Sequence, residues 1–165
     1  MKKSILLLSF LFLSFSFIFA QSELPDVQLK TLEGKTVSIR DYIQPGKPTV
    51  ISFWATWCSP CKRELDAINE IYAEWQEKYN VSVIAVTIDD ARSLTKVKPM
   101  VEQKGWKYTV LSDAGQNLKQ ALNAPSVPQS FLIDGNGKII WTHAGYAAGD
   151  EMELEEQLEN LAGKR

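Results

Sequence analysis

The feature that most constrains the fold is a pair of cysteines, Cys58 and Cys61, at the boundary between two apolar patterns. Residues 49–54, just before the pair, are almost continuously apolar, which is typical of a strand buried on both faces. Beyond the pair, apolar residues recur every three or four positions, which is typical of an amphipathic helix: Leu65, Ile68, Tyr72, Trp75 and Tyr79. The cysteines therefore lie where a buried strand turns into a helix.

This position gives the first cysteine a special environment. The first N–H groups of a helix have no intrahelical acceptor and the helix dipole is positive at this end, so both favour a thiolate at Cys58. Pro60 falls in the first turn, where its missing N–H costs nothing. Cys61 lies one turn later on the same face, within disulfide reach. We expect Cys58 to attack a partner disulfide and Cys61 to resolve the mixed disulfide.

A static disulfide and half of a zinc site are the alternatives for this pair. A disulfide that closes so short a loop removes little entropy from the unfolded chain and adds little stability. Structural zinc takes four ligands, and the chain offers two cysteines and one histidine, His143. His143 alternates with Ile139 and Trp141 on a predicted strand, so a packing or surface role is the ordinary explanation. We expect no metal and no other cofactor.

The remaining patterns predict an α/β fold. We expect a hairpin of residues 27–29 and 36–39, a buried strand at 81–88, a helix at 94–104 ended by Gly105, a strand at 108–111 and a short helix at 117–122.

The last third of the chain predicts an antiparallel hairpin and a final helix instead of alternating strands and helices. A turn at residues 134–137 predicts an antiparallel hairpin of 129–133 with 138–143. Asp150 with Glu153 resembles a capping box that opens a final helix. The natural packing is a mixed central sheet with helices on both faces.

The first 20 residues predict a signal peptide outside the fold. Lys2 and Lys3 precede an apolar run of 15 residues, 5–19, and Ala20 is followed by the expected cleavage point. The run is shorter than the about 20 residues that span a membrane. An uncleaved anchor is the alternative, and no cysteine follows the run to carry a lipid. We expect one domain over residues 21–165, exported to the periplasm or another extracytoplasmic space.

The net charge of the chain indicates which classes of partner to expect. Cleavage after Ala20 removes two of the 18 basic residues and none of the 20 acidic ones, so the formal net charge changes from −2 to −4. A mildly acidic chain without a basic block does not favour nucleic acid as a partner. We expect a monomer.

Residues 53–62, Phe-Trp-Ala-Thr-Trp-Cys-Ser-Pro-Cys-Lys, resemble the active-site segment of the thioredoxin superfamily, most closely that of the exported TlpA/ResA-like reductases. Val127-Pro128 and the apolar segment after it resemble the family's cis-proline strand. The helix and strand within residues 94–111 match an extra unit of the exported members. The similarity runs from about Leu24 to the end. It implies a thioredoxin-like fold with an N-terminal hairpin and an extra central helix–strand unit.

The resemblance also implies how a substrate binds. A cis bond before Pro128 would turn the Val127 backbone towards Cys58, where it can pair with an incoming peptide. The family more often has threonine after this proline, and Gln129 stands here, which bears on substrate preference rather than on the fold. Trp57 is expected to be an exposed docking surface, and Trp54 to pack under the active-site loop.

Glu64 lies one turn beyond Cys61, about 60° from it on a helical wheel of about 100° per residue and at the rim of the apolar face. From this spacing alone, a solvated edge glutamate is the simpler interpretation. ResA-like proteins use a glutamate at this offset, and Ser52, which cannot act as a base, replaces the buried aspartate of thioredoxin. The resemblance thus implies that Glu64 exchanges a proton with Cys61.

The leading hypothesis is a reductase of disulfides in exported proteins, with apocytochromes c before haem attachment as one candidate substrate and a membrane protein as electron donor. One alternative is a peroxidase of the peroxiredoxin type. Its nucleophile usually follows a proline by seven residues and a threonine by three, where this chain has Ile51 and Ala55. The other is a non-enzymatic metal carrier, such as the copper chaperones of this fold, which use a wider cysteine spacing plus a histidine.

Overall fold

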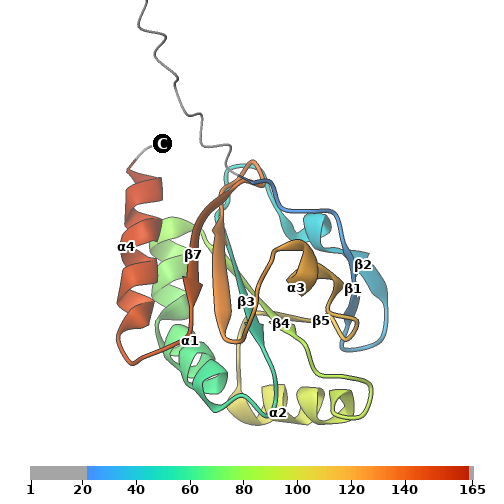
Figure 1. Ribbon diagram of the computed structural model, residues 1–165. Coiled ribbons are helices and arrows are strands. Elements are labelled where there is room, and N and C mark those ends of the chain that lie inside the picture. Colours follow the sequence, from blue (N-terminus) through green and yellow to red (C-terminus); the bar gives the residue numbers. More distant parts are fainter. Residues whose placement is uncertain (1–21, 164–165) are drawn as a thin grey trace, which may run out of the picture.

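A seven-stranded mixed sheet forms the centre of the computed structural model, which describes residues 22–163 (Figure 1). The strand order is β2-β1-β5-β4-β3-β6-β7; β3 pairs in parallel with β4, and β4 with β5, while the other pairs are antiparallel. The strands are β1 (Gln28–Thr31), β2 (Thr36–Ser38), β3 (Thr49–Trp54), β4 (Ser82–Thr87), β5 (Thr109–Ser112), β6 (Gln129–Ile133) and β7 (Ile139–Ala144).

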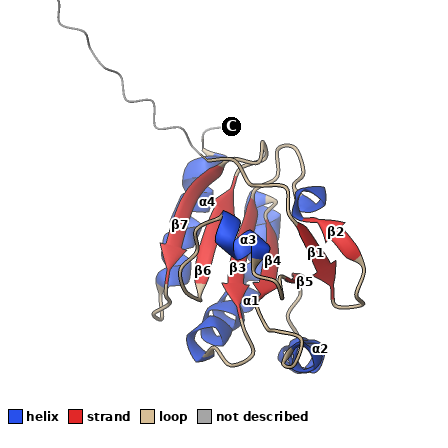
Figure 2. Ribbon diagram, turned by 45° about the vertical axis from the view of Figure 1, so that its right-hand side comes forward, coloured by secondary structure: helices blue, strands red, loops and turns tan. Residues whose placement is uncertain are grey.

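Helices cover both faces of this sheet. They are α1 (Ser59–Tyr79), α2 (Val97–Lys104), α3 (Asn117–Ala121) and α4 (Asp150–Ala162), with 3-10 turns at Ile39–Tyr42 and Leu94–Lys96. Helices α1 and α4 pack side by side on one face, and α3 lies on the other (Figure 2). The predicted α/β thioredoxin-like architecture, with its N-terminal hairpin and extra helix–strand unit, is confirmed. Among the described residues, no helix combines the length and the apolar character needed to cross a membrane.

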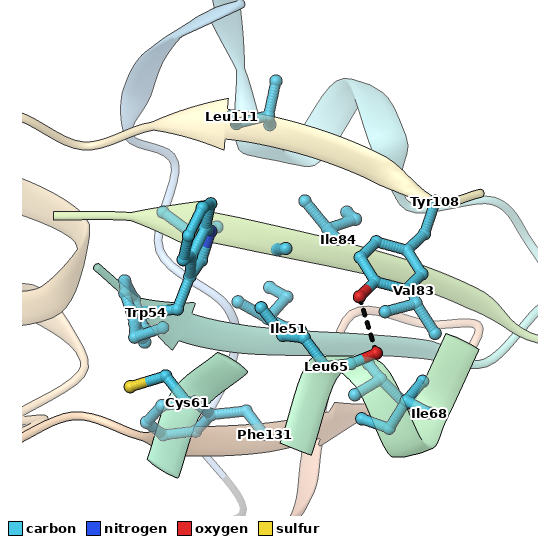
Figure 3. Packing of buried hydrophobic residues seen from close by; sticks show 14 of the residues in the cluster. Ile51, Trp54, Cys61, Leu65, Ile68, Val83, Ile84, Tyr108, Leu111 and Phe131 are labelled. Atoms are coloured by element: carbon cyan, nitrogen blue, oxygen red, sulfur yellow. Dashed lines mark hydrogen bonds between the residues drawn. The ribbon is translucent and has the colours of Figure 1, made fainter. Parts of the chain in front are cut away.

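The core lies between β3 and α1. All six residues of β3 are buried, with β4 on one side and β6 on the other, as its unbroken apolar pattern predicts. Leu65 and Ile68 project from α1 onto this part of the sheet, and the Tyr108 hydroxyl donates to the Leu65 carbonyl at 2.9 Å (Figure 3). Each buried aliphatic side chain of this kind contributes about 1.5–3 kcal/mol. The start of α1 is therefore fixed on a rigid layer.

The ends of the helices test the predicted boundaries. Gly105 ends α2 in the left-handed conformation, with φ of 66°, as predicted. The segment predicted as one helix at 94–104 is a 3-10 turn followed by α2.

Trp54 is fully buried and packs edge-on against Trp106, with ring centroids 4.9 Å apart, as expected for a residue under the active-site loop.

The predicted capping box at the start of α4 is wrong. Gly149 occupies the N-cap with φ of 104°, and no side chain caps the helix. Asp150 is the first helical residue, and its carboxylate accepts from the Ala147 N–H at 2.7 Å and binds His143 Nε2 at 3.1 Å. Glu153 faces the other nitrogen of the same ring at 3.5 Å. Both acids are therefore engaged by β7 and the loop after it. The predicted signal peptide, residues 1–20, lies outside the described residues.

Candidate active site

The two cysteines form a disulfide at the start of α1, with their Cα atoms 5.4 Å apart. Cys58 is the N-cap residue, with extended backbone angles (φ −86°, ψ 101°), and Ser59 and Pro60 open the first turn. The Cys61 N–H, one of the otherwise unpaired N–H groups of the helix, donates to Cys58 Sγ at 3.3 Å. The helix terminus is thus aimed at the Cys58 sulfur, as the sequence predicts.

The two cysteines differ in access to solvent. Cys58 is 5% exposed, whereas Cys61 is fully buried on the face of α1 that packs on the sheet (Figure 3). A partner sulfur has to approach the pair from solvent, so Cys58 is the more accessible of the two cysteines.

Glu64 lies one turn further along the same face and is buried, with 5% exposure. The interpretation as a solvated edge residue, which the spacing alone favours, is therefore wrong. Two hydroxyls hold its carboxylate: Ser52 Oγ donates to Oε2 at 3.1 Å and Ser130 Oγ to Oε1 at 2.7 Å. Burial raises the pKa of Glu64 to about 7, even though both serine hydrogen bonds act to lower it.

The sheet register explains how the two hydroxyls meet. Ser52 on β3 and Ser130 on β6 are direct partners in the antiparallel ladder, so they present both hydroxyls to the same helix. The next partner in the row is His143 on β7, opposite Ser130. A charged His143 would lower the pKa of Glu64, and Asp150 acts in the opposite direction. The sequence marks Ser52 only as a missing base and carries no signal for Ser130, because only the sheet register joins the two residues to Glu64.

The peptide bond between Val127 and Pro128 is cis, as the resemblance implies. Val127 and Trp57 line one groove of about 380 Å³ together with Ile88, Gln116, Lys119, Pro125 and Ser126. Trp57 is 65% exposed, which confirms that its ring lies on the surface. The structure thus brings two of the three predicted substrate-binding positions, Val127 and Trp57, the neighbour of Cys58, to one groove, and Pro128 is not among the residues that line it.

Gln129, the departure from the family pattern, does not reach this groove with its amide. Its side chain is buried, and Nε2 donates to the His143 carbonyl at 2.9 Å. The residue therefore ties β6 to β7.

Among the described residues, no cluster of three or more histidine, cysteine, aspartate or glutamate side chains is arranged to hold a metal ion. His143 instead stacks on Trp141, with ring centroids 5.5 Å apart, and faces the carboxylates of Asp150 and Glu153. A packing and surface role, which the strand alternation suggests for this histidine, matches these contacts.

A thioredoxin-like sheet whose central strand leads into a Cys-Ser-Pro-Cys helix start defines the class of thiol–disulfide oxidoreductases. The chain belongs to the AhpC/TSA family, whose model matches residues 20–142. The thiol-disulfide oxidoreductase ResA of Bacillus thuringiensis (strain Al Hakam) is 35% identical over 131 residues, which cover 79% of this chain and 73% of that protein. The predicted relationship to ResA-like proteins is thereby confirmed.

Two solved structures are also similar to this chain. An uncharacterized thioredoxin-like protein from Porphyromonas gingivalis is 48% identical, with a TM-score of 0.74 over 84% of this chain and 90% of that one. A putative thiol:disulfide interchange protein DsbE from Chlorobium tepidum is 28% identical, with a TM-score of 0.75 over 86% and 96%. With Cys58 and Cys61 in place, this chain is a thiol–disulfide oxidoreductase.

Proposed function

We propose that this protein is an exported reductase of protein disulfides in which Cys58 is the nucleophile and Cys61 the resolving cysteine. The observation that carries this proposal is the position of Cys58 Sγ at the N-terminus of α1, where it accepts the Cys61 N–H at 3.3 Å. A thiolate at this position is stabilised by the same N–H groups and by the helix dipole. The residual exposure of Cys58, against none at Cys61, supports the same order of attack.

The exchange consists of two displacements. The Cys58 thiolate attacks a substrate disulfide, so that a mixed disulfide forms, the substrate S–S bond breaks and one substrate sulfur leaves as thiolate. Cys61 then loses its proton, attacks the Cys58 sulfur and expels the second substrate sulfur. Two electrons pass to the substrate, and the protein ends as the Cys58–Cys61 disulfide. A dithiol donor, which we propose to be a membrane protein, restores the reduced pair.

Glu64 is the group that we propose accepts the Cys61 proton. Its pKa of about 7 suits a base that works near neutral pH, because a useful fraction of the carboxyl is ionised there. Glu64 lies one turn after Cys61 on the same buried face. Ser52 and Ser130 hold the carboxylate in place while it gains or loses the proton.

A kinetic comparison tests the role of Glu64. The change Glu64→Gln keeps the shape of the side chain and one acceptor for the serine hydroxyls. We expect resolution of a preformed mixed disulfide to accelerate as pH rises through about 7 in the parent and to lose this rise in the variant. Alkylation of Cys58 should proceed in both proteins. Equal resolution rates at every pH would remove Glu64 from the mechanism.

The groove beside Cys58 is the proposed binding surface for the substrate. Trp57 is exposed and Val127 lines the same groove. We propose that the Val127 backbone pairs there with an extended peptide, as in strand addition. The substrates are proposed to be disulfide-containing exported proteins, with apocytochromes c as one candidate. The protein itself is proposed to act as a monomer.

Export is proposed from the N-terminal pattern, with residues 1–20 as the signal peptide and 21–165 as the domain. Sequencing the N-terminus of the protein from an extracytoplasmic fraction should give Gln21 first. Intact Met1 in a membrane fraction would identify the uncleaved anchor instead.

Two assays on the reduced protein test the activity: one follows its oxidation by a protein disulfide, and the other measures its redox equilibrium with glutathione. We expect one Cys58–Cys61 disulfide to form for each substrate disulfide reduced, and the reduction potential against glutathione to lie near the thioredoxin end of the range, at about −270 mV. Faster oxidation by a hydroperoxide than by a protein disulfide would favour the peroxidase alternative. A potential near −120 mV would make the protein an oxidant.

A further inference from the structure

The loop that carries Cys58 from β3 into α1, residues 55–57, meets the side chains of Asp89 and Lys62 at Thr56. Thr56 lies two positions before Cys58 and is buried. Its N–H donates to Asp89 Oδ2 at 2.8 Å, and its hydroxyl donates to Asp89 Oδ1 at 2.7 Å. Its carbonyl accepts from Lys62 Nζ at 2.9 Å. All three polar groups of Thr56 are therefore bound by charged side chains.

Asp89 is itself held rigidly. It is fully buried, two residues beyond the end of β4. The Thr87 hydroxyl donates to Oδ2 at 2.6 Å while it accepts the Asp89 N–H at 3.1 Å, which fixes the direction of the hydroxyl. The Ile88 N–H also donates to the Trp54 carbonyl, so the ends of β3 and β4 are joined next to this carboxylate. Three donors, the Thr56 N–H, the Thr56 hydroxyl and the Thr87 hydroxyl, thus occupy the acceptors of this buried carboxylate.

The mechanism described above does not use Asp89 or Lys62, although both act on the loop that places its nucleophile. The two charges have opposite signs and meet at Thr56. By Coulomb's law, a negative charge near Cys58 opposes formation of the thiolate and a positive charge favours it. Any change in the stability of the thiolate changes the stability of the reduced form and hence the reduction potential.

We propose that Asp89 and Lys62 are positioning residues that act through Thr56: together they fix Cys58 at the N-terminus of α1, and their opposed charges set how readily its sulfur ionises. This inference rests on the proposed role of Cys58 as the nucleophile. The other titratable or charged groups near the loop are Cys61, Arg63, Glu64 and Asp66 in the first turns of α1, and Lys119 on α3, which lines the groove with Trp57.

The test compares charge-removing variants of similar shape. We expect Asp89→Asn to lower the midpoint pH of Cys58 alkylation and to shift the equilibrium with glutathione about three- to tenfold towards the dithiol. Lys62→Met should shift both quantities the other way. A tenfold change in this equilibrium corresponds to about 30 mV. Arg63→Met removes the same charge from an exposed neighbour on the helix and should match the parent.

Variants of Thr56 separate positioning from simple structural support. Thr56→Ser keeps both donors and should retain the parental alkylation profile and reduction potential. Thr56→Val loses the hydroxyl donor, so both its alkylation profile and its potential should shift.

If Asp89→Asn fails to fold, Lys62→Met provides the test, because the Lys62 side chain is only partly buried.

Two outcomes are distinguishable. If Asp89→Asn and Lys62→Met lower the unfolding temperature but leave the alkylation profile and the potential of the parent unchanged, this inference is wrong and the proposed function is untouched. If the parent itself is alkylated first at Cys61, the assignment of the nucleophile fails instead.

Discussion

Ser52 and Ser130 face each other across the β3–β6 ladder, and both hydroxyls donate to the carboxylate of Glu64. A hydrogen bond to the ionised form lowers a carboxyl pKa, so the two serines oppose the effect of burial. The fraction of Glu64 that is ionised near neutral pH therefore depends on two residues of different strands.

Removal of either hydroxyl should raise the pKa of Glu64 above its value of about 7. The hydrogen bond from Ser130 is shorter than that from Ser52, at 2.7 Å against 3.1 Å, and it lowers the pKa of Glu64 more. Ser130→Ala should therefore have the larger effect on this pKa. The pH dependence of mixed-disulfide resolution should move to higher pH in both variants, and stability should fall by about 1–3 kcal/mol. A profile that stays in place would mean that the serines only pack against Glu64.

The stability of the oxidised protein should depend on pH through Glu64. The folded-state pKa of about 7 lies above the ordinary value of 4.5, so between these values the folded state keeps a proton that the unfolded chain loses. Stability therefore falls as pH rises through this window, by up to about 3 kcal/mol. Urea unfolding of Glu64→Gln at pH 4.5 and pH 8 should lack this decrease. Glu70→Gln, an exposed glutamate of the same helix, is the matched control, and a decrease that survives in Glu64→Gln would contradict the account.

Trp57→Ala should weaken substrate binding with little effect on stability. Trp57 is 65% exposed, so removal of its side chain beyond Cβ should change the free energy of unfolding by at most about 0.5 kcal/mol. We expect KM for a protein disulfide to rise severalfold, while Cys58 alkylation by a small reagent remains near the parental rate. Met152→Ala, which removes a similarly exposed apolar side chain on α4, should leave both quantities unchanged. An unchanged KM in Trp57→Ala would exclude the ring from docking.

The elements next to the active site could be predicted from the sequence because their signals are local. The apolar run of β3, the helical period of α1 and the cysteine spacing each specify one element, and they agree on where the strand ends and the helix begins.

The features that sequence reasoning missed depend on contacts between distant segments. Glu64 lies at the rim of the apolar arc, and whether a rim residue is buried depends on the register that brings Ser130 over it. Asp150 has the spacing of a cap, but its carboxylate is bound by Ala147 and His143. The bond from Thr56 to Asp89 joins residues 33 positions apart, which no local pattern encodes.

Trapping of mixed disulfides shows which cysteine attacks the substrate and which one resolves the intermediate. Reduced Cys61→Ser and Cys58→Ser proteins are incubated with a disulfide-containing protein, quenched with acid and analysed by mass spectrometry. We expect Cys61→Ser to accumulate a mixed disulfide through Cys58, because the helix terminus stabilises the Cys58 thiolate. Cys58→Ser should accumulate almost none, because Cys61 is fully buried. Preferential trapping through Cys61 in Cys58→Ser, with none through Cys58, would contradict this assignment.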